Sequence, residues 1–160
     1  FLQVPEPLIQ KEFSRIMSLK DASKKMSKSE LSDLSRINLT DSKDQIINKI
    51  KKAKTDPMPM PNNLEELNER LEAKNLLGIY ASLTNSSLEK SISNFSGKNF
   101  SEFKESLSEI LVNKIEPISI EIKKLLADQT YLDQILLEGV EKANLIASKK
   151  IKKIKEIVGF

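Results

Sequence analysis

Apolar side chains recur every three or four residues along most of the chain, beginning at about residue 40. This spacing gathers them on one face of an α-helix, where they can pack against a core. The first such stretch predicts a helix that is capped by Thr40 or Asp41 and that ends before the alternating prolines of residues 57–61. Its apolar stripe consists of Ile46, Ile47, Ile50 and Ala53.

Three capping-box spacings predict where further helices begin. In each, a polar residue is followed three positions later by a glutamate, as at Asn63/Glu66, Ser86/Glu89 and Asn99/Glu102. The first predicts a helix with a break near residues 74–78. The second predicts a short helix through Phe95 that Gly97 stops, and the third a long helix that is kinked at Pro117.

The last helix is predicted to begin after Asp128 as its cap and to end near Val158. One side of it is apolar, which predicts a face buried against a partner, with Leu132, Ile135, Leu136, Ala143, Ala147, Ile151 and Ile154 as its members. Together these patterns predict a mainly α protein in which four or five antiparallel helices form a bundle-like domain.

The first forty residues follow a different pattern. They contain Pro5 and Pro7, then the β-compatible run of residues 13–19, then a polar stretch rich in serine and lysine. This order predicts a strand followed by a loop.

Composition narrows the possible chemistry. The chain has no cysteine and no histidine, which excludes zinc fingers, thiol nucleophiles, disulfides and imidazole bases. Nowhere does it approach the ~20 apolar residues that cross a bilayer, so we expect a cytoplasmic protein with no membrane partner. The net charge of +3 is too small by itself to indicate a nucleic-acid partner.

A short loop carries the residues best suited to chemistry. Residues 25–29 read Lys-Met-Ser-Lys-Ser, two cations and two hydroxyls with no acid until Glu30. Lysine ammonium groups and serine hydroxyls both donate to phosphate oxygens, so the loop is suited to a polyphosphate. On composition alone, a loop of this kind is more often solvated surface.

Residues 25–29 also resemble the signature loop of class I aminoacyl-tRNA synthetases, and the surrounding sequence resembles the tryptophanyl family in particular. The resemblance extends along nearly the whole chain, through residues 5–9, 15–29, 51–56 and 138–143. Two positions depart from it, since Ala22 stands where proline is expected and Glu30 where aspartate is expected. Neither departure removes a phosphate ligand.

The resemblance implies a division into two domains. Residues 1–33 would be the C-terminal strand and signature loop of a Rossmann-type nucleotide-binding domain, and residues 34–160 a helical anticodon-binding domain. The chain opens on Phe1 and lacks the family's histidine-containing phosphate loop. We therefore expect the C-terminal half of a longer enzyme, inactive without its N-terminal half.

The resemblance also assigns roles in the activation of tryptophan by ATP, which yields tryptophanyl-adenylate and pyrophosphate before transfer to tRNA(Trp). Lys28 and Lys25 would be the catalytic residues that contact the departing pyrophosphate, with Mg²⁺ bound to ATP and no metal ligand from the protein. Ser27 and Ser29 would hold the phosphates. The backbone at Ile16 and Met26 would contact the adenosine.

Partners are implied in the same way: tRNA(Trp), tryptophan and ATP for the intact enzyme, and a homodimer. Candidate tRNA contacts lie in two lysine clusters, which are Lys49, Lys51, Lys52 and Lys54, and then Lys149, Lys150, Lys152, Lys153 and Lys155. Lysine-rich helix faces are equally often plain solvated surface. A synthetase of the tyrosyl type and a non-catalytic helical RNA-binding module remain alternatives.

Overall fold

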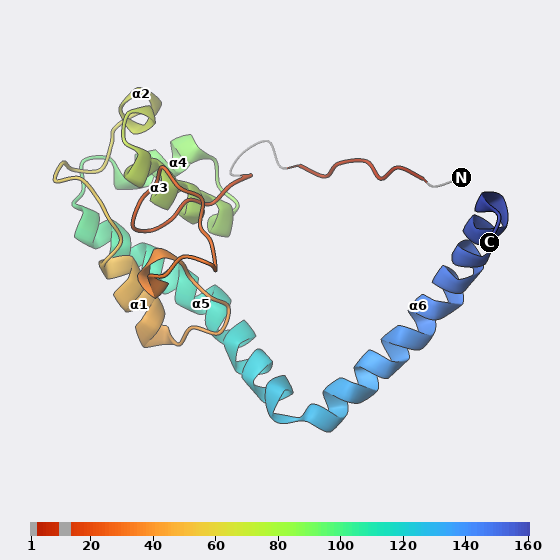
Figure 1. The fold of residues 1–160 in the computed structure, drawn as a ribbon. Helices are drawn as coiled ribbons and strands as arrows, with labels where there is room; N and C mark the ends of the chain where they lie inside the picture. Colours follow the sequence, from red (N-terminus) through yellow and green to blue (C-terminus); the bar gives the residue numbers. More distant parts are fainter. Residues whose placement is uncertain (1–2, 10–13) are drawn as a thin grey trace. The chain divides into compact units, whose positions relative to one another are not determined.

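The computed structural model describes residues 3–9 and 14–160 (Figure 1). The described chain is helical, with no β-strand, so the predicted mainly α fold is confirmed. Its elements are η1 (Asp33–Ser35), α1 (Lys43–Lys51), α2 (Leu64–Asn68), α3 (Leu71–Thr84), α4 (Leu88–Phe95), α5 (Phe100–Ala127) and α6 (Gln129–Val158). Two compact units result, Phe1–Ser119 and Ile120–Phe160. The functional division at residue 33 stays a prediction.

The first unit has one hydrophobic core, to which α1 through α5 all contribute. Its centre includes an aromatic cluster in which the ring of Phe95 stacks edge to face on Tyr80 and on Phe103, each with ring centroids 4.9 Å apart. Such pairs add to the gain from burying the rings. Around them lie fully buried aliphatic side chains from the predicted stripes, among them Ile46, Ile50, Leu67, Leu76, Leu77 and Leu107.

Helix starts agree with the capping predictions to within one or two residues. Asn63 caps α2, as predicted, by accepting a hydrogen bond from the Glu66 amide. The cap of α4 is Ser87 rather than Ser86. The cap of α1 is Ser42, in a capping box with Gln45. Thr40 and Asp41 were wrong because the Asp41 carboxylate is buried in an ion pair and is not available as a cap.

The break between α2 and α3 lies at Glu69 and Arg70, not near residues 74–78. Arg70 leaves the helical conformation, and its guanidinium binds the Asp56 carboxylate at 2.6 and 2.9 Å and the Pro59 carbonyl at 2.7 Å. Gly78, which suggested a break further on, is buried inside α3. A tertiary ion pair therefore places this break.

The predicted strand at residues 13–19 does not form. Phe13 lies outside the described residues, and the remaining run makes a single antiparallel bridge between Met17 and Lys25. A strand needs a neighbouring strand along its length to satisfy its backbone groups. Here the run pairs with residues 24–26 at one bridge, and the other Met17 groups bond to the Asn75 side chain, so the predicted strand is not seen in the described residues.

The second unit consists of the end of α5 and all of α6. Asp128 caps α6, as predicted, by accepting from the Tyr131 amide. This chain does not itself bury the predicted apolar face, since α6 has no buried residue and the side chains of Ile135 and Leu136 are 45% and 65% exposed, so its burial against a partner stays a prediction. Two turns of α5 and one helix provide no core that could cover this face. None of the described helices is long and apolar enough to cross a membrane.

Candidate phosphate-binding loop

The signature loop, residues 25–29, is closed at its first end by a short antiparallel pairing. The Ser18 amide donates to the Lys24 carbonyl at 2.8 Å, and the Met26 amide donates to the Ile16 carbonyl at 2.9 Å. Ile16 and Met26 are partly buried against the core. The two residues predicted to meet the adenosine through their backbones therefore lie paired, side by side, at the base of the loop.

Asn75 of α3 fixes this pairing to the helical core. Its side-chain oxygen accepts from the Met17 amide and its side-chain nitrogen donates to the Met17 carbonyl, both at 2.9 Å. Asn75 is only 9% exposed. Both backbone groups of Met17 are thus satisfied by one amide side chain, a position that the helical pattern gave no reason to select.

Substituting Asn75 with alanine would leave the Met17 amide and carbonyl without these partners. Unsatisfied buried polar groups cost about 1–3 kcal/mol, so we expect Asn75→Ala to lower the free energy of unfolding by that amount. Urea denaturation followed by circular dichroism measures the change. Asn94→Ala on α4, whose side chain is exposed, is the control. Equal stability of the two variants would contradict the role of Asn75.

The loop itself presents both signature lysines to solvent. Lys25 and Lys28 are exposed, whereas Ser27 is partly buried. Two long hydrogen bonds shape the turn, from the Ser29 amide to the Ser27 hydroxyl at 3.3 Å and from the Glu30 amide to the Ser27 carbonyl at 3.4 Å. Two cations and a serine turn on one exposed loop can receive an anion of several charges.

The turn before the loop is held by Asp21. Its carboxylate accepts from the Ser23 hydroxyl at 2.6 Å and from the Ser23 amide at 3.1 Å, and it lies 3.4 Å from the Lys24 ammonium. The Ser23 hydrogen bonds, with a smaller contribution from Lys24, hold the pKa of Asp21 below its usual value. Asp21 therefore stays ionised and engaged in its own turn near neutral pH, next to the loop lysines.

The candidate lysines for tRNA are not equivalent. Lys51 and Lys52 are exposed, but Lys54 pairs with Glu72 at 2.8 Å. Lys49 is buried, and its ammonium lies 2.7 Å from both the Asp33 and the Asp41 carboxylates. The interpretation of Lys49 as a tRNA contact was therefore wrong, because its charge is turned into the protein.

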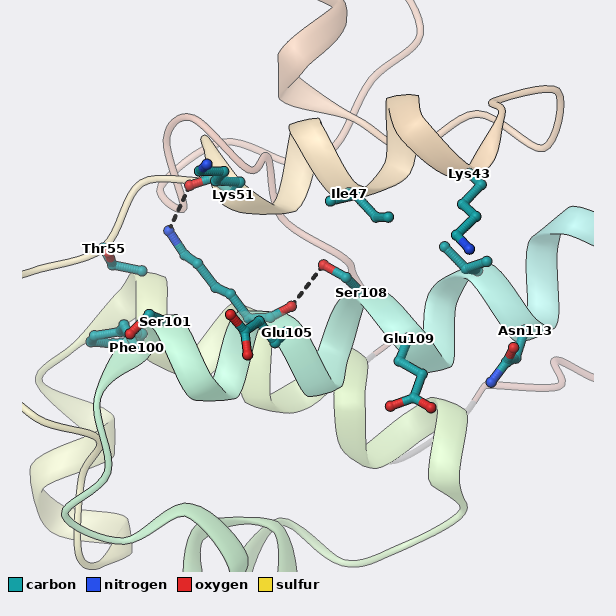
Figure 2. Close-up of a pocket in the computed structure, with 12 residues that line it drawn as sticks. Lys43, Ile47, Lys51, Thr55, Phe100, Ser101, Glu105, Ser108, Glu109 and Asn113 are labelled. Atoms are coloured by element: carbon teal, nitrogen blue, oxygen red, sulfur yellow. Dashed lines mark hydrogen bonds between the residues drawn. The ribbon is translucent and has the colours of Figure 1, made fainter.

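A further hollow on the first unit is lined by no residue of the signature loop. It is a groove of about 800 Å³ between α1 and α5, with Lys43, Ile47 and Lys51 on the α1 side and Glu105 and Glu109 on the α5 side (Figure 2). None of the residues predicted to bind ATP lines it, whereas Lys51, a candidate tRNA contact, does.

Lys104 of α5 closes one end of this groove. Its ammonium donates to the carbonyls of Ala53 and Lys51, at 2.6 and 3.2 Å, at the C-terminal end of α1. Burial lowers the pKa of this lysine. The groove therefore contains a structural cation that ties two helices together, and phosphate chemistry is better assigned to the loop.

The geometry described so far is that of an exposed loop, rich in lysine and serine, anchored on a helical domain. The family model described as tRNA synthetases class I (W and Y) matches residues 1–116. The chain belongs to this family of class I aminoacyl-tRNA synthetases.

Two similar curated proteins of known name are both tryptophan–tRNA ligases. The chain is 48% identical to a tryptophan–tRNA ligase of Agrobacterium fabrum over its whole length, and 49% identical to that of Rickettsia felis over 99% of its length. It covers 45% and 48% of those relatives. The chain thus spans about half the length of the curated relatives it matches, and the resemblance seen in the sequence is confirmed.

Solved structures give the same result for the fold. A tryptophanyl-tRNA synthetase from Mycoplasma pneumoniae superposes with a TM-score of 0.74 at 26% identity, over 94% of this chain and 45% of that one. The enzyme from Campylobacter jejuni, complexed with ADP and tryptophan, gives a TM-score of 0.69 at 24% identity, over 98% of this chain and 47% of that one.

Proposed function

We propose that the chain is the C-terminal portion of a tryptophan–tRNA ligase, and that it stabilises pyrophosphate during tryptophan activation. One observation carries this proposal: the signature loop is anchored to the helical core by the Met17 pairing and by Asn75, while Lys25 and Lys28 remain exposed. An anchored loop with free cations is suited to a charge that develops only as the reaction proceeds.

In the proposed reaction the tryptophan carboxylate attacks the α-phosphorus of ATP. The bond from that phosphorus to the bridging oxygen breaks, and pyrophosphate leaves with the additional negative charge. The ammonium groups of Lys28 and Lys25 meet that charge, and Ser27 and Ser29 donate to the phosphate oxygens. ATP would arrive as its Mg²⁺ complex, and no group of three acidic side chains capable of holding a metal occurs among the described residues.

The helical region would bind tRNA(Trp). Support comes from the exposed lysines of α1 and α6, which can contact phosphates, whereas the aromatic rings of Phe95 and Phe103 are buried and cannot stack on bases. The setting for this activity is the cytoplasm, and the intact enzyme would act as a homodimer. As proposed from the sequence, this chain alone would form no adenylate.

The experiment is ATP–pyrophosphate exchange by the full-length protein, with each of the twenty amino acids in turn. We expect exchange to require tryptophan and to be absent from the isolated chain. Exchange that requires tyrosine would favour the other amino acid covered by the family description. A full-length protein that exchanges with no amino acid but binds tRNA would support the non-catalytic module instead.

A further inference from the structure

We infer that Arg36 is a positioning residue that holds the second end of the signature loop, an inference that rests on the proposed function. Its guanidinium makes contacts through all three nitrogens. Nη1 donates to the Glu30 carbonyl at 2.8 Å, Nε donates to the Asn38 side-chain oxygen at 3.1 Å, and Nη2 lies 3.1 Å from the Asp33 carboxylate. The side chain is 17% exposed. Glu30 directly follows the loop, so this is the first side-chain anchor beyond Ser29.

The contacts of Arg36 belong to a closed network that reaches α1. Asp33 shares the Lys49 ammonium with Asp41, and the Asn38 amide nitrogen donates to both carboxylates, at 3.0 and 3.2 Å. Two cations balance two anions, so the network carries no uncompensated charge. We call it the Arg36 network; its members are the Glu30 carbonyl, Asp33, Arg36, Asn38, Asp41 and Lys49.

Hydrogen bonding and ion pairing favour the charged form of Asp33, on which the network depends. The pKa of Asp33 is lowered mainly by its hydrogen bond with Lys49, then by Asn38, and also by the charge of Arg36. The groups that face the Asp33 carboxylate are thus two cations, Lys49 and Arg36, and one neutral donor, Asn38. Asp33 therefore favours its charged form beside Arg36, whose guanidinium also donates to the Glu30 carbonyl.

The loop needs this second anchor because its own hydrogen bonds are weak. Its first end is fixed by Met26, Met17 and Asn75. Between Met26 and Glu30 the two turn bonds are 3.3 and 3.4 Å long, near the limit of a useful hydrogen bond. The position of Lys28 is thus set by what holds the chain on either side of it.

Loss of the second anchor would leave Lys28 in the protein but less well placed. Small displacements of a charged group weaken stabilisation of a transition state far more than binding of a substrate elsewhere. We therefore expect an effect on kcat of activation with little effect on the KM for tryptophan. A purely structural role would lower stability and leave kcat unchanged below the unfolding temperature.

The test uses the full-length ligase with Arg36→Ala and Arg36→Lys. A hydrogen bond from a charged donor is worth enough to predict a fall of about tenfold in kcat of tryptophan-dependent exchange for Arg36→Ala. Arg36→Lys keeps the positive charge beside Asp33 and so protects the fold, but one ammonium cannot reach all three acceptors. We expect a smaller but measurable fall in kcat for it.

Arg70→Ala is the matched control. Arg70 has the same kind of contacts, an aspartate and a backbone carbonyl, and its side chain is 10% exposed. Its partners, however, are Asp56 and Pro59, in the proline-rich segment between α1 and α2. We expect it to lower the melting temperature without lowering kcat.

The outcomes separate the inference from the proposed function. If Lys28→Ala abolishes exchange while both Arg36 variants stay within about twofold of the unsubstituted kcat, the inference is overturned and the proposed function stands. If Arg36→Ala does not fold, Arg36→Lys alone decides. Absence of tryptophan-dependent exchange in the unsubstituted protein would overturn the proposed function itself.

Discussion

Lys28→Ala is expected to reduce kcat of tryptophan-dependent ATP–pyrophosphate exchange by about 100- to 1000-fold, the loss typical when one preorganised donor to a developing charge is removed. Lys28 is exposed at the outer part of the anchored loop, where its ammonium can follow charge onto the leaving group. Its interaction strengthens as pyrophosphate departs, so the KM for tryptophan should change little.

Lys20→Ala is the control for Lys28. Lys20 is also an exposed lysine of the first unit, five positions before the loop, and its backbone amide donates to the Ser18 hydroxyl. The control variant should keep the unsubstituted kcat, which rules out a general effect of removing positive charge. Equal activity of the Lys28 and Lys20 variants would show that the loop is solvated surface.

Local signals in the sequence were sufficient for most helix starts. The Asn63 and Asp128 caps were predicted correctly because a cap depends on a side chain and an amide three residues away. The start of α1 was missed because Asp41, an excellent cap by type, is engaged by Lys49, eight positions along the chain. Tertiary pairing overrode the local preference there.

The signature lysines were found from the sequence, but the residues that hold their loop were not. Asn75 contacts Met17 across 58 positions, and no periodicity reports such a distance. A faint signal existed, since an asparagine directly before Leu76 and Leu77 on a buried stretch of α3 needs a hydrogen-bond partner. Arg36 gave no signal of this kind, because arginine in a polar loop is ordinary.

Charge patterning identified lysine clusters without distinguishing their environments. Lys49 and Lys52 are three positions apart on α1 and its cap, yet one is buried and the other exposed. The same limit applies to α6, whose apolar stripe was predicted to face a partner and which no other part of this chain buries. A periodic pattern shows which side chains share a face, and only the fold shows what covers it.

Lys49→Met is expected to lower the free energy of unfolding by about 3–5 kcal/mol, because it leaves a buried carboxylate without its cation. Lys49 and Asp41 have side chains that are only 3% and 4% exposed, and their charges are 2.7 Å apart. Methionine keeps the unbranched shape, so most of the loss comes from charge. Urea denaturation of the chain, followed by the circular dichroism of its helices, measures this loss of stability.

Two further variants make this prediction specific. Lys52→Met removes an exposed lysine at the end of α1 and should change stability by no more than about 0.5 kcal/mol. Asp41→Asn combined with Lys49→Met removes both buried charges, so the double variant should be more stable than the sum of the single losses predicts. Strict additivity of the two substitutions would contradict a direct Lys49–Asp41 pair.

Because Lys49 is turned inward, its loss should weaken tRNA binding only through unfolding, whereas Lys52→Met should weaken binding with stability intact.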